Sequence, residues 1–266
     1  MKSDITIGGY LPLDSVLHGL DPRTKLLGLI AMLASIFWSP VPAGVLATAV
    51  PIFILAVLSR AGWKIWLRST YRFAVMLAAV LGLNVFFRTQ GRPVFMGQWE
   101  LPITWEGLEI GLIFTFQIMQ AIVAALVLTF TTSPTEMSRG VELLSKPLKR
   151  LRVPVDDLGM VVLLAMRFVP LLQQELNATI EAQKSRGVDF RKGRLSTRAG
   201  NLVALLSPAL SGALRRADLL ALAMTARGFQ PGGTRTQFKP LKFRRADRTA
   251  VGVLLLFLGC RLTLLP

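Results

Sequence analysis

The sequence contains a single cysteine, Cys260, and a single histidine, His18. One cysteine excludes a disulfide bond within the chain. One histidine argues against a zinc site of the usual kind and against a histidine-based catalytic triad. The chain also lacks the Gly-x-x-x-x-Gly-Lys-Ser/Thr loop that cradles nucleotide phosphates. We therefore expect no enzyme, and no cofactor bound by this chain itself.

Acidic residues are almost missing from the long apolar runs, where Glu109 is the only one. A proton-coupled pump would usually carry paired carboxylates inside a span. The runs also show no pair of interrupted spans of the kind that marks inverted transporter repeats. A self-sufficient membrane permease is therefore kept only as the alternative interpretation.

Apolar residues and positive charge are abundant. Hydrophobic residues make up 52% of the 266 residues, the mean hydropathy is +0.52 and the net charge is +16. Soluble domains are only about 45–50% apolar even when glycine is counted. The combination indicates a membrane protein with a basic cytoplasmic face. Nucleic-acid binding would explain the charge but not the apolar runs, so we expect no nucleic-acid partner.

Five apolar runs are candidates for membrane-spanning helices, and they cover residues 26–39, 43–58, 73–87, 107–130 and 249–260. Asp21 is a good N-cap for the first run, with Pro22 at the first helical position. Gln117 and Gln120 lie three residues apart in the fourth and are expected to hydrogen-bond a neighbouring helix. Arg261 is expected to extend from the last run to the far membrane interface. The predicted fold class is an all-α integral membrane protein with about five transmembrane helices.

The distribution of basic residues predicts the orientation. Residues 59–72 carry four basic residues, two tryptophans and no acid, so we expect an interfacial helix there. Residues 88–106 are expected to form a loop on the opposite side. With the N terminus in the cytoplasm, the segments predicted to lie inside hold 28 of the 31 Lys and Arg residues. The reverse orientation would oppose the positive-inside bias.

A basic insert, residues 132–247, precedes the last apolar run and holds 20 Lys and Arg against 9 Asp and Glu. Ser133, Pro134 and Glu136 predict a helix start with a capping box. The predicted domains are residues 1–131 with four spans, residues 132–247 as a cytoplasmic helical domain, and residues 248–266 as the last span.

One helix of the insert is apolar enough to resemble a span. It covers residues 158–176, but Arg167 and Pro170 interrupt it. A span here would also carry the basic residues 184–198 to the outer side of the membrane. We therefore predict a helix that lies along the inner edge of the membrane.

Two helices of the insert are expected to end alike, with an arginine between a small residue and a glycine. The endings are Ser185-Arg186-Gly187 and Ala226-Arg227-Gly228. The unpaired carbonyls of a helix end favour a cation, and a following glycine allows the left-handed cap that stops the helix. One such ending would indicate only a well-capped helix. Two of them, with small neighbours, suggest arginines that pair with carboxylates of another protein.

Two stretches resemble the signatures of a known family. Asp14-Ser15-Val16-Leu17-His18 with Leu20-Asp21-Pro22-Arg23-Thr24-Lys25, and Thr225-Ala226-Arg227-Gly228-Phe229, are similar to the N- and C-terminal signatures of the transmembrane T component (EcfT) of energy-coupling factor transporters. Ser185-Arg186-Gly187 occupies the place of the family's other arginine motif, which often has alanine before the arginine. The resemblance covers essentially the whole chain and favours the shared type of T component.

The resemblance implies a non-catalytic coupling subunit in a prokaryotic cell membrane, with its coupling domain in the cytoplasm. Two ABC ATPase subunits, EcfA and EcfA′, would bind the arginine motifs and use the ATP. A membrane-embedded S component, which binds a vitamin or metal ion, would rest on the apolar faces of the coupling helices and topple as they spread. The predicted ATPase contacts are Ser185, Arg186, Gly187, Ala226, Arg227 and Gly228. The predicted S-component contacts are Met160, Leu164, Phe168, Leu171, Leu206 and Leu210.

Overall fold

The computed structural model describes residues 10–38, 41–87, 93–96, 99–188, 195–230, 232, 243 and 245–264. The chain divides into two compact units. The first unit comprises residues Met1–Leu143 and Lys239–Pro266, and the second comprises Leu144–Phe238. The predicted domains were defined by the side of the membrane rather than by contacts between helices, and they stay a prediction.

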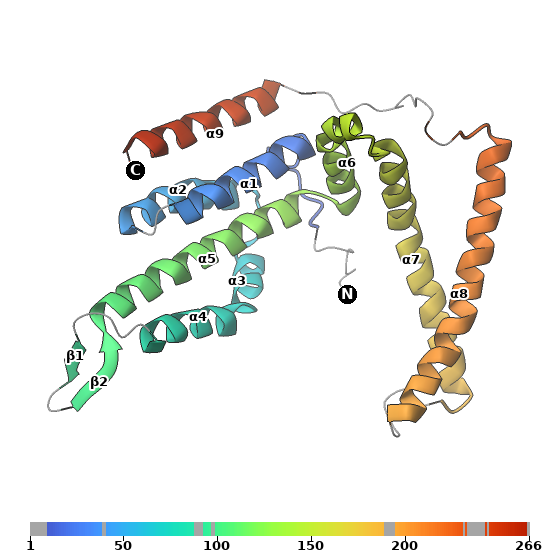
Figure 1. Cartoon of the computed structure of the whole chain (residues 1–266), viewed down its shortest axis with the longest axis horizontal. Helices are drawn as coiled ribbons and strands as arrows, with labels where there is room; N and C mark the ends of the chain where they lie inside the picture. The colour runs from blue at the N-terminus through green and yellow to red at the C-terminus, as the bar shows by residue number, and fades with distance from the viewer. Residues whose placement is uncertain are drawn as a thin grey trace. The chain divides into compact units, whose positions relative to one another are not determined.

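The first unit is built around one long helix, α5 (Figure 1). This helix packs against α1 and α2 and against α4, while α9 packs against α1. The bounds of these helices are α1 Pro22–Trp38, α2 Pro42–Leu58, α3 Trp63–Tyr71, α4 Ala74–Phe87, α5 Trp105–Thr131, α6 Pro134–Leu144 and α9 Arg245–Leu264. A helix that is apolar on all sides is usually buried among other helices or in a membrane, and α5 has this character.

Two clusters of buried apolar side chains hold the helices together. In one, Met32 and Ile36 of α1 pack with Ile52 of α2. In the other, Trp66 of α3 meets Phe130 of α5 edge to face, with ring centroids 5.2 Å apart. Edge-to-face pairs of this kind stabilise a fold by about 0.5–1.5 kcal/mol beyond the burial of their area.

The two glutamines of α5 bond to neighbouring helices, as the sequence predicts. The Nε2 of Gln117 donates to the Ile36 carbonyl of α1 at 2.9 Å. The Nε2 of Gln120 donates to the Val45 carbonyl of α2 at 2.9 Å, and its Oε1 accepts from the Thr48 hydroxyl at 2.7 Å. Both glutamines are buried. Because a buried amide is costly unless its partners are supplied, these bonds fix α5 against α1 and α2.

The predicted helix starts are also confirmed. The Asp21 carboxylate accepts from the Arg23 main-chain N–H at 2.9 Å, so Asp21 caps α1. At α6, the Glu136 N–H donates to the Ser133 hydroxyl at 3.3 Å, and the Ser133 N–H donates to the Glu136 carboxylate at 3.2 Å. This reciprocal pair is the capping box expected from the sequence.

Asp21 and Lys25, at the start of α1, connect this helix to the ends of α9 and α5 in the first unit. The main-chain N–H of Asp21 donates to the fully buried carboxylate of Asp247, in α9, at 2.7 Å. Lys25 donates from Nζ to the Thr131 carbonyl at the end of α5, at 2.8 Å. Lys25 lies just before the first predicted span. Burial of its ammonium group lowers its pKa, whereas the negative charges of Glu136, Asp247 and Asp21 act in the opposite direction and raise it.

One predicted loop contains strands. Strands β1 (Pro93–Met96) and β2 (Trp99–Thr104) form an antiparallel hairpin within residues 88–106. The prediction rested on glycine, proline and charged residues. It gave too little weight to Val94, Phe95 and Ile103, whose side chains suit a strand.

The structure gives one helix that is long and apolar enough to cross a membrane, among the residues it describes. This is α5, which has 27 residues. A second candidate is the pair α3 and α4, which passes the same test jointly but is bent by 51° at their junction. Helix α2 is apolar but has only 17 residues. The chain is a helical membrane protein, and the number of five spans stays a prediction.

The second unit consists mainly of two long helices. A short 3-10 helix, η1 (Lys146–Leu151), leads into α7 (Val155–Ser185), and α8 (Leu195–Ala226) follows. Figure 1 shows α8 running back in the direction opposite to α7 and crossing it. Helix α6 stops at Leu144, and η1 begins two residues later with Lys146 and Pro147.

Candidate functional site

Helix α7 ends in a defined capping motif at Arg186. Arg186 is the C-cap residue, and Gly187 adopts a φ of +83°. The Gly187 N–H donates to the Lys184 carbonyl at 2.9 Å, and the Val188 N–H donates to the Gln183 carbonyl at 3.1 Å. These two bonds define the Schellman motif, in which a left-handed residue turns the chain out of the helix.

Helix α8 ends in the same way at Arg227. Gly228 adopts a φ of +76° and donates from its N–H to the Thr225 carbonyl at 2.9 Å. The Phe229 N–H donates to the Met224 carbonyl at 3.0 Å. Arg186 and Arg227 therefore hold the same position in the same motif, although the sequence around them differs.

Both motifs are accessible. Arg186 and Arg227 are exposed, as are Ser185 and Ala226 before them. Neither guanidinium group makes a hydrogen bond or an ion pair within the described part of the chain. The small neighbours leave each guanidinium uncovered, and the helix dipole favours a cation at this end. The structure thus places all six predicted contact residues at two exposed helix ends.

The two ends lie at opposite ends of the α7–α8 pair, because the helices run in opposite directions (Figure 1). Between them, the Glu175 carboxylate of α7 forms an ion pair with the Arg216 guanidinium of α8. Gly212 of α8 lies beside Glu175, and a Cβ added to this glycine would come within 3.3 Å of the carboxylate. The sequence alone does not reveal this pair, because the spacing of the residues does not indicate which acid on α7 faces which base on α8.

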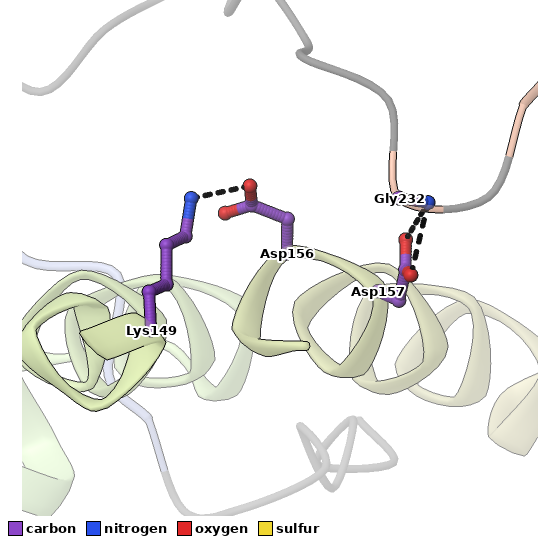
Figure 2. A network of polar contacts seen from close by, with 4 residues as sticks. All are labelled: Lys149, Asp156, Asp157 and Gly232. Atoms are coloured by element: carbon purple, nitrogen blue, oxygen red, sulfur yellow. Dashed lines mark hydrogen bonds and ion pairs between the residues drawn. The ribbon is translucent and has the colours of Figure 1, made fainter. Parts of the chain in front are cut away.

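Two aspartates at the start of α7 hold neighbouring segments in place (Figure 2). Asp156 forms an ion pair with Lys149 of η1. Asp157 accepts from the main-chain N–H of Gly232, with a distance of 3.1 Å to its Oδ2. Because Gly232 follows the Arg227 motif by only a few residues, Asp157 ties the chain beyond α8 to the beginning of α7. Two acids in the first turn of a helix are known to stabilise it, so the sequence can indicate that role. It does not indicate that Lys149 and Gly232 are their partners.

The predicted S-component contacts lie on both helices of the second unit. Leu171, Leu206 and Leu210 are exposed, whereas Met160, Leu164 and Phe168 are half-buried. Other apolar residues that are exposed on these helices include Leu158, Val161, Val162, Leu163, Val169, Leu202, Val203 and Leu214. Both helices therefore expose many large apolar side chains, and this surface is a candidate for contact with an apolar partner.

The single histidine has a structural role. The Nε2 of His18 contacts the Leu11 carbonyl at 3.0 Å, and its Nδ1 contacts the Ser15 hydroxyl at 2.7 Å. A ring with its proton on Nε2 donates to the Leu11 carbonyl and accepts the Ser15 hydroxyl proton at Nδ1. An open hollow of about 470 Å³ lies beside it and is lined by Asp14, Ser15, Val16, His18, Gly19 and Arg60. No group of three or more His, Cys, Asp or Glu residues suited to a metal ion occurs among the residues that the structure describes.

The protein is a helical membrane protein whose two long helices end in exposed arginine caps, as the resemblance to a T component implies. Residues 14–239 match the family described as Cobalt transport protein (CbiQ), and the chain belongs to this family.

Relatives from several bacteria support the assignment. An energy-coupling factor transporter transmembrane protein EcfT of Limosilactobacillus fermentum is 34% identical over 256 residues, which cover 96% of each chain. Proteins of the same name from Thermosediminibacter oceani and Heliobacterium modesticaldum are both 38% identical, over 93% of this chain and 92% of each relative. The resemblance stated from the sequence is thereby confirmed.

Proposed function

We propose that this protein is the coupling subunit of an energy-coupling factor transporter. In this role it carries no catalytic site. It links ATP hydrolysis by two separate ATPase subunits to the uptake of a vitamin or metal ion through a membrane partner, the S component. The names of its relatives support the transporter, and the arginine caps support the coupling role.

The proposal rests on the observation that the two caps have the same structure. Each places one guanidinium at the exposed C-terminal end of a helix of about 45 Å, given 1.5 Å of rise per residue. Neither guanidinium has a partner among the residues described. A planar guanidinium can form two parallel hydrogen bonds to a carboxylate, which gives a docked helix end a fixed orientation. Two such ends fit two ATPase subunits, one at each end of the α7–α8 pair.

The exposed apolar surface of α7 and α8 supports a second contact. An apolar face of this extent needs either lipid or an apolar protein partner. We assign it to the S component, with the predicted residues Leu171, Leu206 and Leu210 exposed for that contact. Movement of the helix ends by the ATPases would then change the surface on which the S component rests. In this proposal residues 132–247 lie in the cytoplasm, and residues 1–131 and 248–266 hold the spans in the cell membrane.

An uptake measurement tests the proposal against a self-sufficient permease. Proteoliposomes would be made from the purified chain alone and from the complex isolated from the source organism. Uptake of radiolabelled vitamins and of cobalt ions would be measured with and without ATP. We expect uptake only in the complex and only with ATP. Uptake by the chain alone would contradict the coupling role and favour the permease.

A further inference from the structure

Helix α3 has an exposed face that divides into two parallel stripes. With about 100° between successive residues, Trp63, Leu67 and Tyr71 form one stripe, and Lys64 and Arg68 form the next. The opposite side of the helix faces the protein, where Trp66 is 8% exposed. By contrast, Trp63 is 73% exposed and Tyr71 is 78% exposed. The helix is therefore fixed to the first unit by one side and presents two chemically distinct stripes on the other.

No ion pair neutralises the cationic stripe among the residues that the structure describes. It extends at a spacing of four residues from Arg60 through Lys64 and Arg68 to Arg72, and residues 59–72 include no acid. All four side chains are exposed, and none forms an ion pair in the described ranges. Like charges four residues apart destabilise a helix, so a row of them is better tolerated against a negatively charged surface.

The aromatic stripe indicates what kind of surface this is. Tryptophan and tyrosine favour the boundary between the acyl chains and the headgroups of a bilayer. The helices before and after α3 in the chain also expose apolar side chains, such as Phe53 in α2 and Val75 and Phe87 in α4. An acidic protein surface would match the cations but would leave the exposed rings beside them unexplained. A lipid bilayer matches both stripes.

The bend after α3 provides independent support. Helices α3 and α4 differ in direction by 51° across a short break. A helix that continued the span would follow the axis of α4, whereas a helix at the membrane surface must turn away from it.

We propose that α3 binds the headgroups of anionic phospholipids. Lys64 and Arg68 contact the lipid phosphates, and Trp63, Leu67 and Tyr71 enter the layer beneath them. Arg60 and Arg72 extend the cationic row at either end. Asp14 also lines the hollow beside Arg60, so we assign the phosphate contact to the exposed row and not to the hollow.

Trp63 provides a local probe of the bound lipid. In a full-length variant with Trp38, Trp66, Trp99 and Trp105 replaced by Phe, fluorescence reports on Trp63 alone. Proteoliposomes would contain phosphatidylcholine with an equal minor fraction of either brominated phosphatidylglycerol or brominated phosphatidylcholine. We expect stronger quenching by the brominated phosphatidylglycerol. Equal quenching by the two lipids would overturn the proposal.

Substitutions test the two cations directly. Lys64→Gln with Arg68→Gln should weaken the preference for phosphatidylglycerol by about fivefold for each cation removed. Lys64→Arg with Arg68→Lys keeps both charges and should keep the preference. Arg150→Gln with Arg152→Gln removes two exposed cations from the second unit and should also leave it unchanged. Full lipid preference in the double glutamine variant would contradict the proposal. Loss of a co-purifying protein from this variant, with the lipid preference unchanged, would also contradict it.

A second measurement avoids the tryptophan replacements. Native mass spectrometry of the otherwise unaltered chain in detergent, titrated with phosphatidylglycerol, counts the lipids that stay bound. The glutamine pair should retain fewer than the charge-preserving pair, and equal numbers in the two would refute the assignment.

Discussion

Glu175 and Arg216 form an ion pair between α7 and α8, and each lies eleven residues before the arginine at the end of its helix. At 1.5 Å per residue, the pair stands roughly 16 Å along each helix from Arg186 and from Arg227. Because the helices run in opposite directions, the pair holds a middle position between two ends that point apart (Figure 1). We interpret the pair as the contact that sets how far apart these ends lie.

Removing this ion pair should loosen the distance between the two helix ends. In a Cys260→Ser background, spin labels at Ser185→Cys and Ala226→Cys report that distance by double electron–electron resonance spectroscopy. Glu175→Gln should broaden the distribution, and the exchange of Glu175→Arg with Arg216→Glu should narrow it again. Because both side chains are about one-third exposed, the loss of stability should stay below about 1 kcal/mol.

Glu181 supplies the control for this measurement. It is an exposed acid on the same helix that forms no ion pair within the ranges described. Glu181→Gln should leave the distance distribution unchanged. Equal broadening in the two glutamine variants would show that helix charge, and not the pair, is responsible.

The glycines of the two caps should be sensitive to a side chain. Gly187 and Gly228 have positive φ values, which cost an alanine about 1–2 kcal/mol. Thermal unfolding in detergent should therefore show a lower midpoint for Gly187→Ala and Gly228→Ala. Gly200 lies within α8, with nothing within 4 Å of an added Cβ. Gly200→Ala should raise the midpoint or leave it unchanged, and a drop equal to that of the cap variants would count against the left-handed caps.

The buried amide of Gln120 should contribute to the stability of the first unit. Gln120→Leu removes its bonds to the Val45 carbonyl and the Thr48 hydroxyl. The expected cost is about 1 kcal/mol, near the upper range for side-chain hydrogen bonds between membrane helices. The midpoint of thermal unfolding measures it. Gln174→Leu, at an exposed position of α7, is the matched control and should have little effect.

The contact between Asp21 and Asp247 should be needed to hold α9. Asp247→Ala leaves the Asp21 N–H without its acceptor, at a cost of about 2 kcal/mol. Asp247→Asn keeps an acceptor oxygen and should cost less. Limited proteolysis of the detergent-solubilised protein should release α9 more readily from the alanine variant. Asp218→Ala, at an exposed site on α8, should behave like the unaltered protein.

The helices and their ends could be predicted from the sequence because the signals are local. Caps at Asp21 and Ser133 depend on one side chain and the next few main-chain groups. The arginine caps were predictable for the same reason, since Arg-Gly after a periodic run is itself the signal. The polarity of Gln117 and Gln120 in an apolar helix likewise required partners nearby.

Contacts between distant residues were not predictable in the same way. Asp21 and Asp247 are 226 positions apart, and only the packing of α9 on α1 brings them together. Arg261 is buried and donates to the Gly44 carbonyl at the start of α2, 217 positions away. Its place at the far membrane interface stays a prediction, but the sequence did not indicate this acceptor.

Recovery of the ATPase subunits with the tagged chain tests whether the two arginine caps bind these subunits. Arg186→Glu and Arg227→Glu would each be purified from cells that express the whole transporter, alongside Arg215→Glu. Arg215 is an exposed arginine in the middle of α8 and serves as the control for a reversed charge. We expect each cap variant to lose ATPase subunits, the double variant to lose nearly all of them, and Arg215→Glu to retain them. Full recovery of the ATPase subunits with both arginines reversed would show that the caps do not bind them.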